Sequence, residues 1–290
     1  YHHMNEYRRG GNLLDRPPHE ADIAEQLEHS IDGGGLKFDL FSSDYKHRLS
    51  VFTSAQNTDR DSYYGTAQDP NAYGKTTDLT FMAGTQYAYS FDNFLFMPSD
   101  LTAGLEYNYD HLKDEMIGYN RYTNQKVHIE SLFLQNEWKN KMWSFLVGAR
   151  MDKHNMIDNV IFSPRANVRF NPTEDINIRA SYSSGFRAPQ AFDEDMHISA
   201  VGGEIAMIQR AKDLKEEKSQ SLSTSVDFYH RFKNGIQTNF LIEGFYTSLS
   251  DVFVLEDIGK DEQGNIIKER RNGSGAKVMG LTLEGKSVLS

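Results

Sequence analysis

Apolar and polar residues alternate with a period of two in many stretches of this 290-residue chain. In 101–110, every second residue from Leu101 to Tyr109 is apolar or aromatic, and the residues between them are polar or Gly. This period is typical of a β-strand with one apolar and one polar face. The longest continuous apolar runs, 94–97 and 252–255, are far shorter than the roughly 20 residues of a membrane-spanning helix. The sequence therefore predicts an all-β protein.

Most of the predicted strands reach the roughly 9–11 residues with which a tilted strand crosses a bilayer. Because alternate residues of such a strand face a polar lumen, the low mean hydropathy of −0.62 is compatible with a membrane barrel. We predict an antiparallel transmembrane β-barrel segment of about eleven strands. They are expected at 34–42, 45–56, 76–90, 99–111, 128–139, 142–152, 161–171, 175–184, 217–231, 236–257 and 265–287.

The connections between the predicted strands alternate between short and long. Short ones are expected at 43–44, 91–99, 140–141, 171–174 and 233–235, and long ones at 57–75, 112–127, 153–160, 185–216 and 258–264. Outer-membrane barrels have short periplasmic turns and longer outer loops. We therefore expect residues 1–33 to be an extracellular loop segment with a helical turn at Ala21–Glu28, and 34–290 to be a partial barrel that the chain enters and leaves in its middle.

The composition excludes several functions. Cysteine is absent, which excludes disulfides and thiolate metal sites. The net charge of 31 − 41 = −10 leaves no basic surface for nucleic acid. No Ser or His lies in the sharp turn of a hydrolase nucleophile, so we expect neither enzymatic activity nor a resident cofactor or metal. No signal-peptide pattern is visible.

One motif stands where a predicted strand meets the longest connection. Residues 181–189 read S-Y-S-S-G-F-R-A-P, and Ser163-Pro164-Arg165 precedes them. Gly185 permits a bend, Phe186 suits an aromatic girdle, and Pro189 cannot donate to a strand ladder. The motif therefore predicts the end of a strand at the rim of the membrane.

This stretch resembles the middle-to-late barrel of TonB-dependent outer-membrane receptors, in which S-x-G-[FY]-R-A-P opens a long extracellular loop. Leu214–Ser219 resembles the family's L-x-x-E-x-S strand start, and 272–284 is similar to its N-x-G…G-x-E hairpin. The resemblance covers 161–286 and implies a barrel of 22 strands, of which this chain supplies about half. It further implies the cell outer membrane with its lipid, a plug domain missing here that contacts the TonB complex, and energised import of a small metal chelate: a ferric siderophore, haem or cobalamin.

Candidate ligand-binding residues come from the long connections. Aromatic contact surface is expected from Tyr63, Tyr64, Tyr119 and Tyr122. The resemblance adds Arg187 and also His197, because haem receptors of this class carry a His after F-R-A-P. The neighbouring run 193–195, Asp-Glu-Asp, is interpreted either as a hard-cation site or as a solvated acidic loop.

Lumen-facing charges are expected to pair with one another, since an unpaired buried charge is costly. The expected set comprises Arg150, Arg165, Arg169 and Arg179 with Glu106, Asp227 and Glu284. Two alternatives from other classes stay open at this point, a passive outer-membrane porin or channel and a soluble secreted β-protein.

Overall fold

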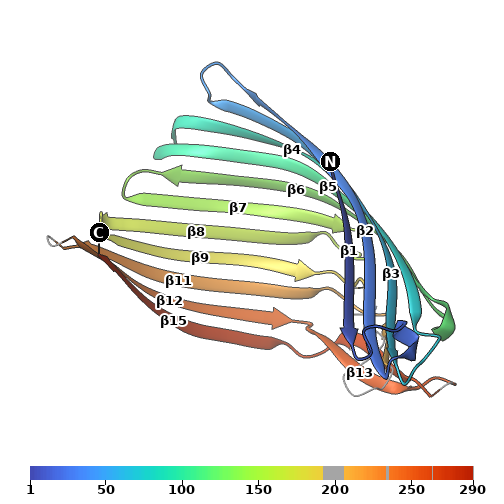
Figure 1. Cartoon of the computed structure of the whole chain (residues 1–290). Coiled ribbons are helices and arrows are strands. Elements are labelled where there is room, and N and C mark those ends of the chain that lie inside the picture. Colours follow the sequence, from blue (N-terminus) through green and yellow to red (C-terminus); the bar gives the residue numbers. More distant parts are fainter. Residues whose placement is uncertain (192–205, 233–234, 263, 290) are drawn as a thin grey trace.

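Antiparallel strands make up almost all of the chain. The computed structural model describes residues 1–191, 206–232, 235–262 and 264–289. They form a 12-stranded sheet of order β1-β2-β3-β4-β5-β6-β7-β8-β9-β11-β12-β15 and a three-stranded sheet of order β10-β14-β13. The large sheet curves strongly and stays open between β1 and β15 (Figure 1). The all-β prediction is confirmed.

The elements of both sheets have the following bounds. The large sheet contains β1 His2–Gly11, β2 Ile23–Phe41, β3 His47–Thr66, β4 Tyr73–Phe94, β5 Met97–Met116, β6 Arg121–Lys139, β7 Trp143–His154, β8 Ile161–Thr173, β9 Ile176–Arg187, β11 Glu217–Arg231, β12 Ile236–Ser250 and β15 Ala276–Leu289. The small sheet contains β10 Ala206–Arg210, β13 Phe253–Lys260 and β14 Ile266–Asn272, and two 3-10 turns are η1 Pro18–Glu20 and η2 Ile117–Tyr119. No helix in the described part of the chain is long and apolar enough to cross a membrane.

Each of the eleven predicted strands overlaps one strand of the large sheet, but three details were wrong. Strand β1 was missed. The predicted strand 236–257 is two strands, β12 and β13, which turn apart at Asp251 with its φ of 54°. The predicted strand 265–287 is likewise divided into β14 and β15, which belong to different sheets.

The prediction of a loop over 1–33 is wrong. Strand β1 pairs antiparallel with β2 from His2↔Gly33 to Gly11↔Ala24, and β2 begins at Ile23. The expected helical turn at Ala21–Glu28 is replaced by η1 and the start of β2. This region lacks a sustained apolar alternation, and its order comes from strand pairing and from the burial of Ala21, Ala24 and Leu27.

The alternate connections lie at opposite ends of the large sheet, as predicted (Figure 1). Two of the expected long loops are short, however. Strands β3 and β4 continue toward each other until only 67–72 separate them, and β5 and β6 are separated by 117–120. The large connections at this end are 188–216, which contains β10, and 251–275, which contains β13 and β14.

The large sheet has one apolar and one polar face. On β5, Leu105 is 56% exposed on the apolar face, whereas its neighbour Glu106 is half-buried on the polar face. The register carries this alternation across the sheet, so that exposed apolar side chains gather on one side, here called the lipid face. They include Leu36, Phe38, Leu49, Val51, Phe81, Leu132, Leu134, Val147, Phe162, Val168, Leu222, Ile242, Leu281 and Leu283. The opposite side is called the lumen face.

Aromatic side chains border the lipid face at both ends. At the turn end, Phe94 stacks on Trp138 with 6.2 Å between centroids, and Trp143 stacks on Phe170 at 4.1 Å. At the loop end, Tyr109 stacks on His128 at 6.2 Å, in the same register row as Phe81. Such girdles mark the two interfaces of a bilayer. The spanning segments therefore run from 81 to 89 on β4 and from 101 to 109 on β5, and the strands continue outward beyond them.

A charge on the lipid face should destabilise the barrel. Leu105 lies at the centre of the spanning segment of β5, so we expect Leu105→Arg to lower the free energy of unfolding in lipid vesicles by about 2–4 kcal/mol. Leu105→Phe at the same position serves as the control and should change it by less than half as much. Equal losses in the two variants would show that Leu105 does not face hydrocarbon.

Candidate ligand-binding site

Charged side chains connect neighbouring strands on the lumen face. Arg150 of β7 reaches across β6 to Glu106 of β5, with 2.9 Å from its NH2 group to Oε1, and its Nε donates to Asp152 at 2.7 Å. Ser131 of β6 completes the network by donating to Asp152 at 2.6 Å. Arg179 lies 3.7 Å from Asp227. The predicted pairing of lumen-facing charges is confirmed for Arg150 with Glu106 and for Arg179 with Asp227.

A second network holds the strands together beyond the membrane. Thr76 of β4 accepts from Arg60 Nε at 3.2 Å and donates to Asp114 Oδ1 at 2.6 Å. Arg121 of β6 donates to the other carboxylate oxygen of Asp114. The Asp114 residue is only 1% exposed, and Arg60 and Arg121 are nearly as deeply buried. Two guanidinium groups therefore compensate one buried carboxylate, which explains how β3 to β6 stay paired there.

An apolar cluster lies beside this network at the outer end, here called the outer core. Its members are Ala21, Ala24, Leu27, Tyr63, Tyr64, Ala72, Met116 and Tyr119, with Met207 of β10 packed against them. The connection 67–72 folds back on β3, where the Tyr63 hydroxyl donates to the Asp69 carbonyl at 2.9 Å and the Tyr119 hydroxyl donates to the Asp69 carboxylate. Burial raises the pKa of Tyr63 to about 12, so its ring stays neutral.

The lumen face contains a cavity of about 580 Å³ between β1 and β6 at the outer margin of the membrane. Gly34 and Gly35 of β2 line it without side chains, and at the adjoining Gly33 a Cβ would lie 2.4 Å from the His2 ring, which also lines the cavity. The lumen-facing residues that line this cavity come from five strands and from one loop residue. They are His2, Ser54, Gln56, Thr80, Met82, Asn108, Asp110, Val127, Ile129 and Gln190.

Two carboxyl groups, Asp78 and Asp110, are hydrogen-bonded to each other at this cavity, just beyond the spanning segments. Burial, together with the charge of Asp78, raises the pKa of Asp110 to about 6. Burial also raises the pKa of Asp78. Two adjacent carboxylates also repel each other, so the wall contains a carboxyl group that takes up a proton more readily than a free aspartate does.

Gln190 and Ala191, which follow the F-R-A-P motif at 186–189, form hydrogen bonds to this wall of the cavity. His154 is fully buried at the end of β7, and its Nδ1 accepts from the Met156 amide at 3.0 Å. Its Nε2 then carries the proton and donates to Gln190 Oε1 at 3.3 Å. The Ala191 amide donates to Gln125 Oε1 at 2.7 Å. These contacts place Gln190 at the edge of the cavity.

The two large outer connections share one small sheet. Strand β10 pairs parallel with β14 from Ala206↔Ile266 to Arg210↔Arg270, and β14 pairs antiparallel with β13. The Asn272 side-chain amide donates to the carbonyls of Lys215 at 3.0 Å and Asp251 at 2.8 Å. This loop sheet reaches the outer core through Met207, which leaves a smaller cavity of about 350 Å³ beside Tyr119 and Arg121.

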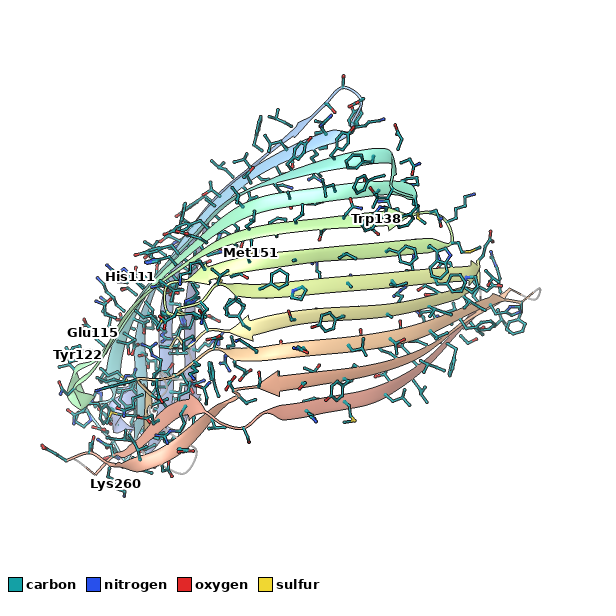
Figure 2. All side chains as sticks on the ribbon, turned by 180° about the vertical axis from the view of Figure 1, so that it is seen from behind. His111, Glu115, Tyr122, Trp138, Met151 and Lys260 are labelled. Carbon is teal, nitrogen blue, oxygen red and sulfur yellow. The ribbon has the colours of Figure 1, made fainter. Side chains whose placement is uncertain are left out.

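The structure does not bring the predicted site residues together in an open loop. Tyr63 (1% exposed), Tyr64 (2%) and Tyr119 (7%) are packed in the outer core, so the prediction that they offer an exposed aromatic surface is wrong. Tyr122 is 60% exposed but lies on the lipid-face side of β6, beyond the membrane (Figure 2). The Arg187 guanidinium lies 5.5 Å from the centroid of Phe253, which joins β9 to the loop sheet. His197 and the 193–195 run lie outside the described residues.

Sequence reasoning missed the residues that do line the cavity. Gln56, Thr80, Asn108 and Asp110 are the polar halves of alternating strands, and nothing in their spacing distinguishes them from other lumen-facing residues. The only sequence signal was the run Gly33-Gly34-Gly35, which removes side chains from one strand of the wall.

A comparison with protein families gave one match that covers nearly the whole chain. The sequence model described as "TonB dependent receptor-like, beta-barrel" matches residues 5–288. The chain belongs to this family. No match was found among the curated proteins.

Solved structures of TonB-dependent receptor barrels share the fold of this chain. The siderophore receptor PirA from Pseudomonas aeruginosa is 16% identical with a TM-score of 0.71, over 91% of this chain and 47% of that one. The hemophore receptor HasR of Serratia marcescens, in complex with HasA and heme, is 14% identical with a TM-score of 0.69, over 92% and 48%. The outer membrane transporter YddB from Escherichia coli is 12% identical with a TM-score of 0.69, over 98% and 42%. This chain therefore spans less than half the length of these receptors.

The F-R-A-P motif of this TonB-dependent receptor barrel ends strand β9, as predicted. Gly185 does not bend the chain, however, because it pairs with Ser219 inside the ladder and β9 continues to Arg187. Phe186 packs against a small cluster of Ile157, Ile161 and Ala188 at the rim. The motif thus packs the end of β9 against the 155–160 connection.

Removing the central carboxylate should loosen the strands outside the membrane. We expect Asp114→Asn to lower the free energy of unfolding in detergent by about 3–5 kcal/mol, because two buried guanidinium groups lose their counter-charge. The neighbouring Glu115 is exposed on the other face, and Glu115→Gln should change the same quantity by less than about 0.5 kcal/mol. Similar stabilities for the two variants would contradict the assigned network.

Proposed function

We propose that the protein to which this chain contributes imports a small metal-chelate nutrient across the outer membrane, with energy supplied by TonB through a plug domain. Membership of the receptor-barrel family over 5–288 carries this proposal. The siderophore receptor PirA and the heme-bound HasR complex, which share the fold, make ferric siderophores and haem the first candidates, and cobalamin is the third.

The lumen-face cavity supports the ligand-binding part of the proposal. Its volume of about 580 Å³ lies within the range of small-molecule sites, roughly 300–1,000 Å³. Amide and hydroxyl groups of Gln56, Thr80, Asn108 and Gln190 line the cavity together with the carboxyl of Asp110. Such a mixed set of donors and acceptors suits the oxygen-rich periphery of a chelate. We assign ligand contact to these residues in place of the buried tyrosines.

The position of the loop sheet supports a role for this sheet in controlling the access of ligand at the outer entrance. It is formed by both large outer connections and contacts the outer core through Met207, on the far side of the lumen from β9 and β11. In the proposed cycle the ligand passes this sheet before it reaches the cavity, and the TonB-coupled plug then releases it inward.

Growth of a deletion strain tests the cargo. Deletion of the gene should abolish growth when one of ferric siderophore, haem or cobalamin is the sole source of its nutrient, and the full-length gene should restore growth. Restoration should also require TonB. Unimpaired growth of the deletion strain on all three sources would refute metal-chelate import, and uptake without TonB would indicate a passive channel.

Filling the cavity tests the site. In the full-length receptor we expect Asn108→Trp to weaken binding of the cargo at least tenfold, because an indole takes up space on the lumen face. Tyr107→Trp is the matched control, since Tyr107 is the adjacent residue on the lipid face, where an indole side chain is favourable. Heat-modifiable mobility in gels should stay normal for both. Unchanged affinity in a folded Asn108→Trp variant would exclude this cavity as the binding site.

A further inference from the structure

A group of basic side chains lies on the lipid face of β5 and β6 immediately beyond the aromatic band. This basic patch consists of His111, Lys113, Lys126 and His128. His111 stands directly opposite Lys126 in the ladder, and His128 stands opposite Tyr109. Figure 2 shows His111 between Met151, toward the membrane, and Glu115, toward the outer end. The four side chains thus share one face and adjacent register rows.

The charges of the two lysines are not used within the protein. In the part of the chain that the structure describes, neither Lys113 nor Lys126 forms an ion pair with a carboxylate. Both are exposed. By contrast, Lys153 on the neighbouring β7 donates to the carbonyls of Ile157 and Asp158 at 2.8 Å, and so serves the 155–160 connection.

Charge is segregated along the outer margin of the lipid face. Strand β3 presents Asp59 and Asp61 there, with Asp61 opposite Lys75, whereas β5 and β6 present the basic patch. Glu115 and Glu130 flank the patch on the same face, but each has its own basic neighbour in the ladder: Glu115 stands opposite Lys75, and Glu130 stands opposite Lys153. An anionic partner is therefore attracted to β5 and β6 and repelled from β3.

The position of the basic patch relative to the aromatic girdle indicates which kind of partner it binds. The last aromatic row is Phe81–Tyr109–His128, and the next row outward contains His111 and Lys126. Rows two residues apart are separated by about 7 Å. An aromatic girdle lies at the level of the headgroups, so the lysines lie where lipid phosphates are found. Below them, Leu105 stands in one row with Leu132 and Met151, and these three side chains face hydrocarbon.

We propose that the basic patch binds the phosphate of an outer-leaflet lipid headgroup. Lys113 and Lys126 supply the charge, and the His111 and His128 rings supply hydrogen-bonding groups beside it. The acyl chains of the same lipid then pass over Leu105 and Leu132. The site is independent of the imported cargo, because it lies on the opposite face of the sheet from the cavity.

Lipid binding to the full-length receptor in non-ionic detergent tests this proposal, with bisphosphorylated lipid A as the probe and native mass spectrometry as the readout. The double variant Lys113→Gln/Lys126→Gln should bind it at least tenfold more weakly than the unmodified receptor. Lys75→Gln is the matched control, because Lys75 lies on the same side between Asp61 and Glu115, and it should bind within twofold.

Three outcomes would overturn the proposal. They are wild-type affinity in the double variant, an equal loss in Lys75→Gln, and equally tight binding of dephosphorylated lipid A. Displacement of lipid A by millimolar inorganic phosphate would instead assign the patch to a soluble anion and would also count against the lipid. Normal heat-modifiable mobility in gels would show that the double variant is folded.

Discussion

A backbone group placed in hydrocarbon must find its hydrogen-bond partner within the protein, because lipid offers none. The large sheet meets this demand by antiparallel pairing of neighbours from β1 through β9 to β11, β12 and β15. Its register is fixed by the alternation of faces, since a slip of one residue would turn Glu106 toward lipid and Leu105 toward the lumen. The contact of Arg150 with Glu106 across β6 depends on that same register.

Beyond the membrane the strands continue for a different reason. Water could satisfy the backbone there, so the pairing of β3 to β6 is sustained by side chains. The Asp114 network on the lumen face and the outer core around Tyr63 supply this support. The result is a wall that rises above the bilayer on one side, with the cavity at its base and the loop sheet against its tip.

The sequence reveals those parts of the fold in which the membrane imposes a pattern. Segment 101–110 alternates because one face meets lipid, and so it was predicted correctly. Strand β1 and the outer part of β3 were missed, because they lack a sustained alternation of apolar and polar residues. The burial of Tyr63 and Tyr119 depends on the folded-back connection at Asp69 and on Met207, which is distant in sequence. The contact between His154 and Gln190 also joins residues distant in sequence, and no local sequence pattern predicts it.

The parallel pairing of β10 with β14 has a consequence for how such a protein can change over generations. In the described residues β10 of one connection pairs only with β14 of the other, whereas β14 also pairs with β13. Shortening 251–275 therefore leaves β10 unpaired, shortening 188–216 leaves one edge of β14 open, and lengthening either shifts the residues that meet Pro189 and Asn272. A new cargo specificity at this entrance therefore requires the two segments to be exchanged together, as a single inherited unit.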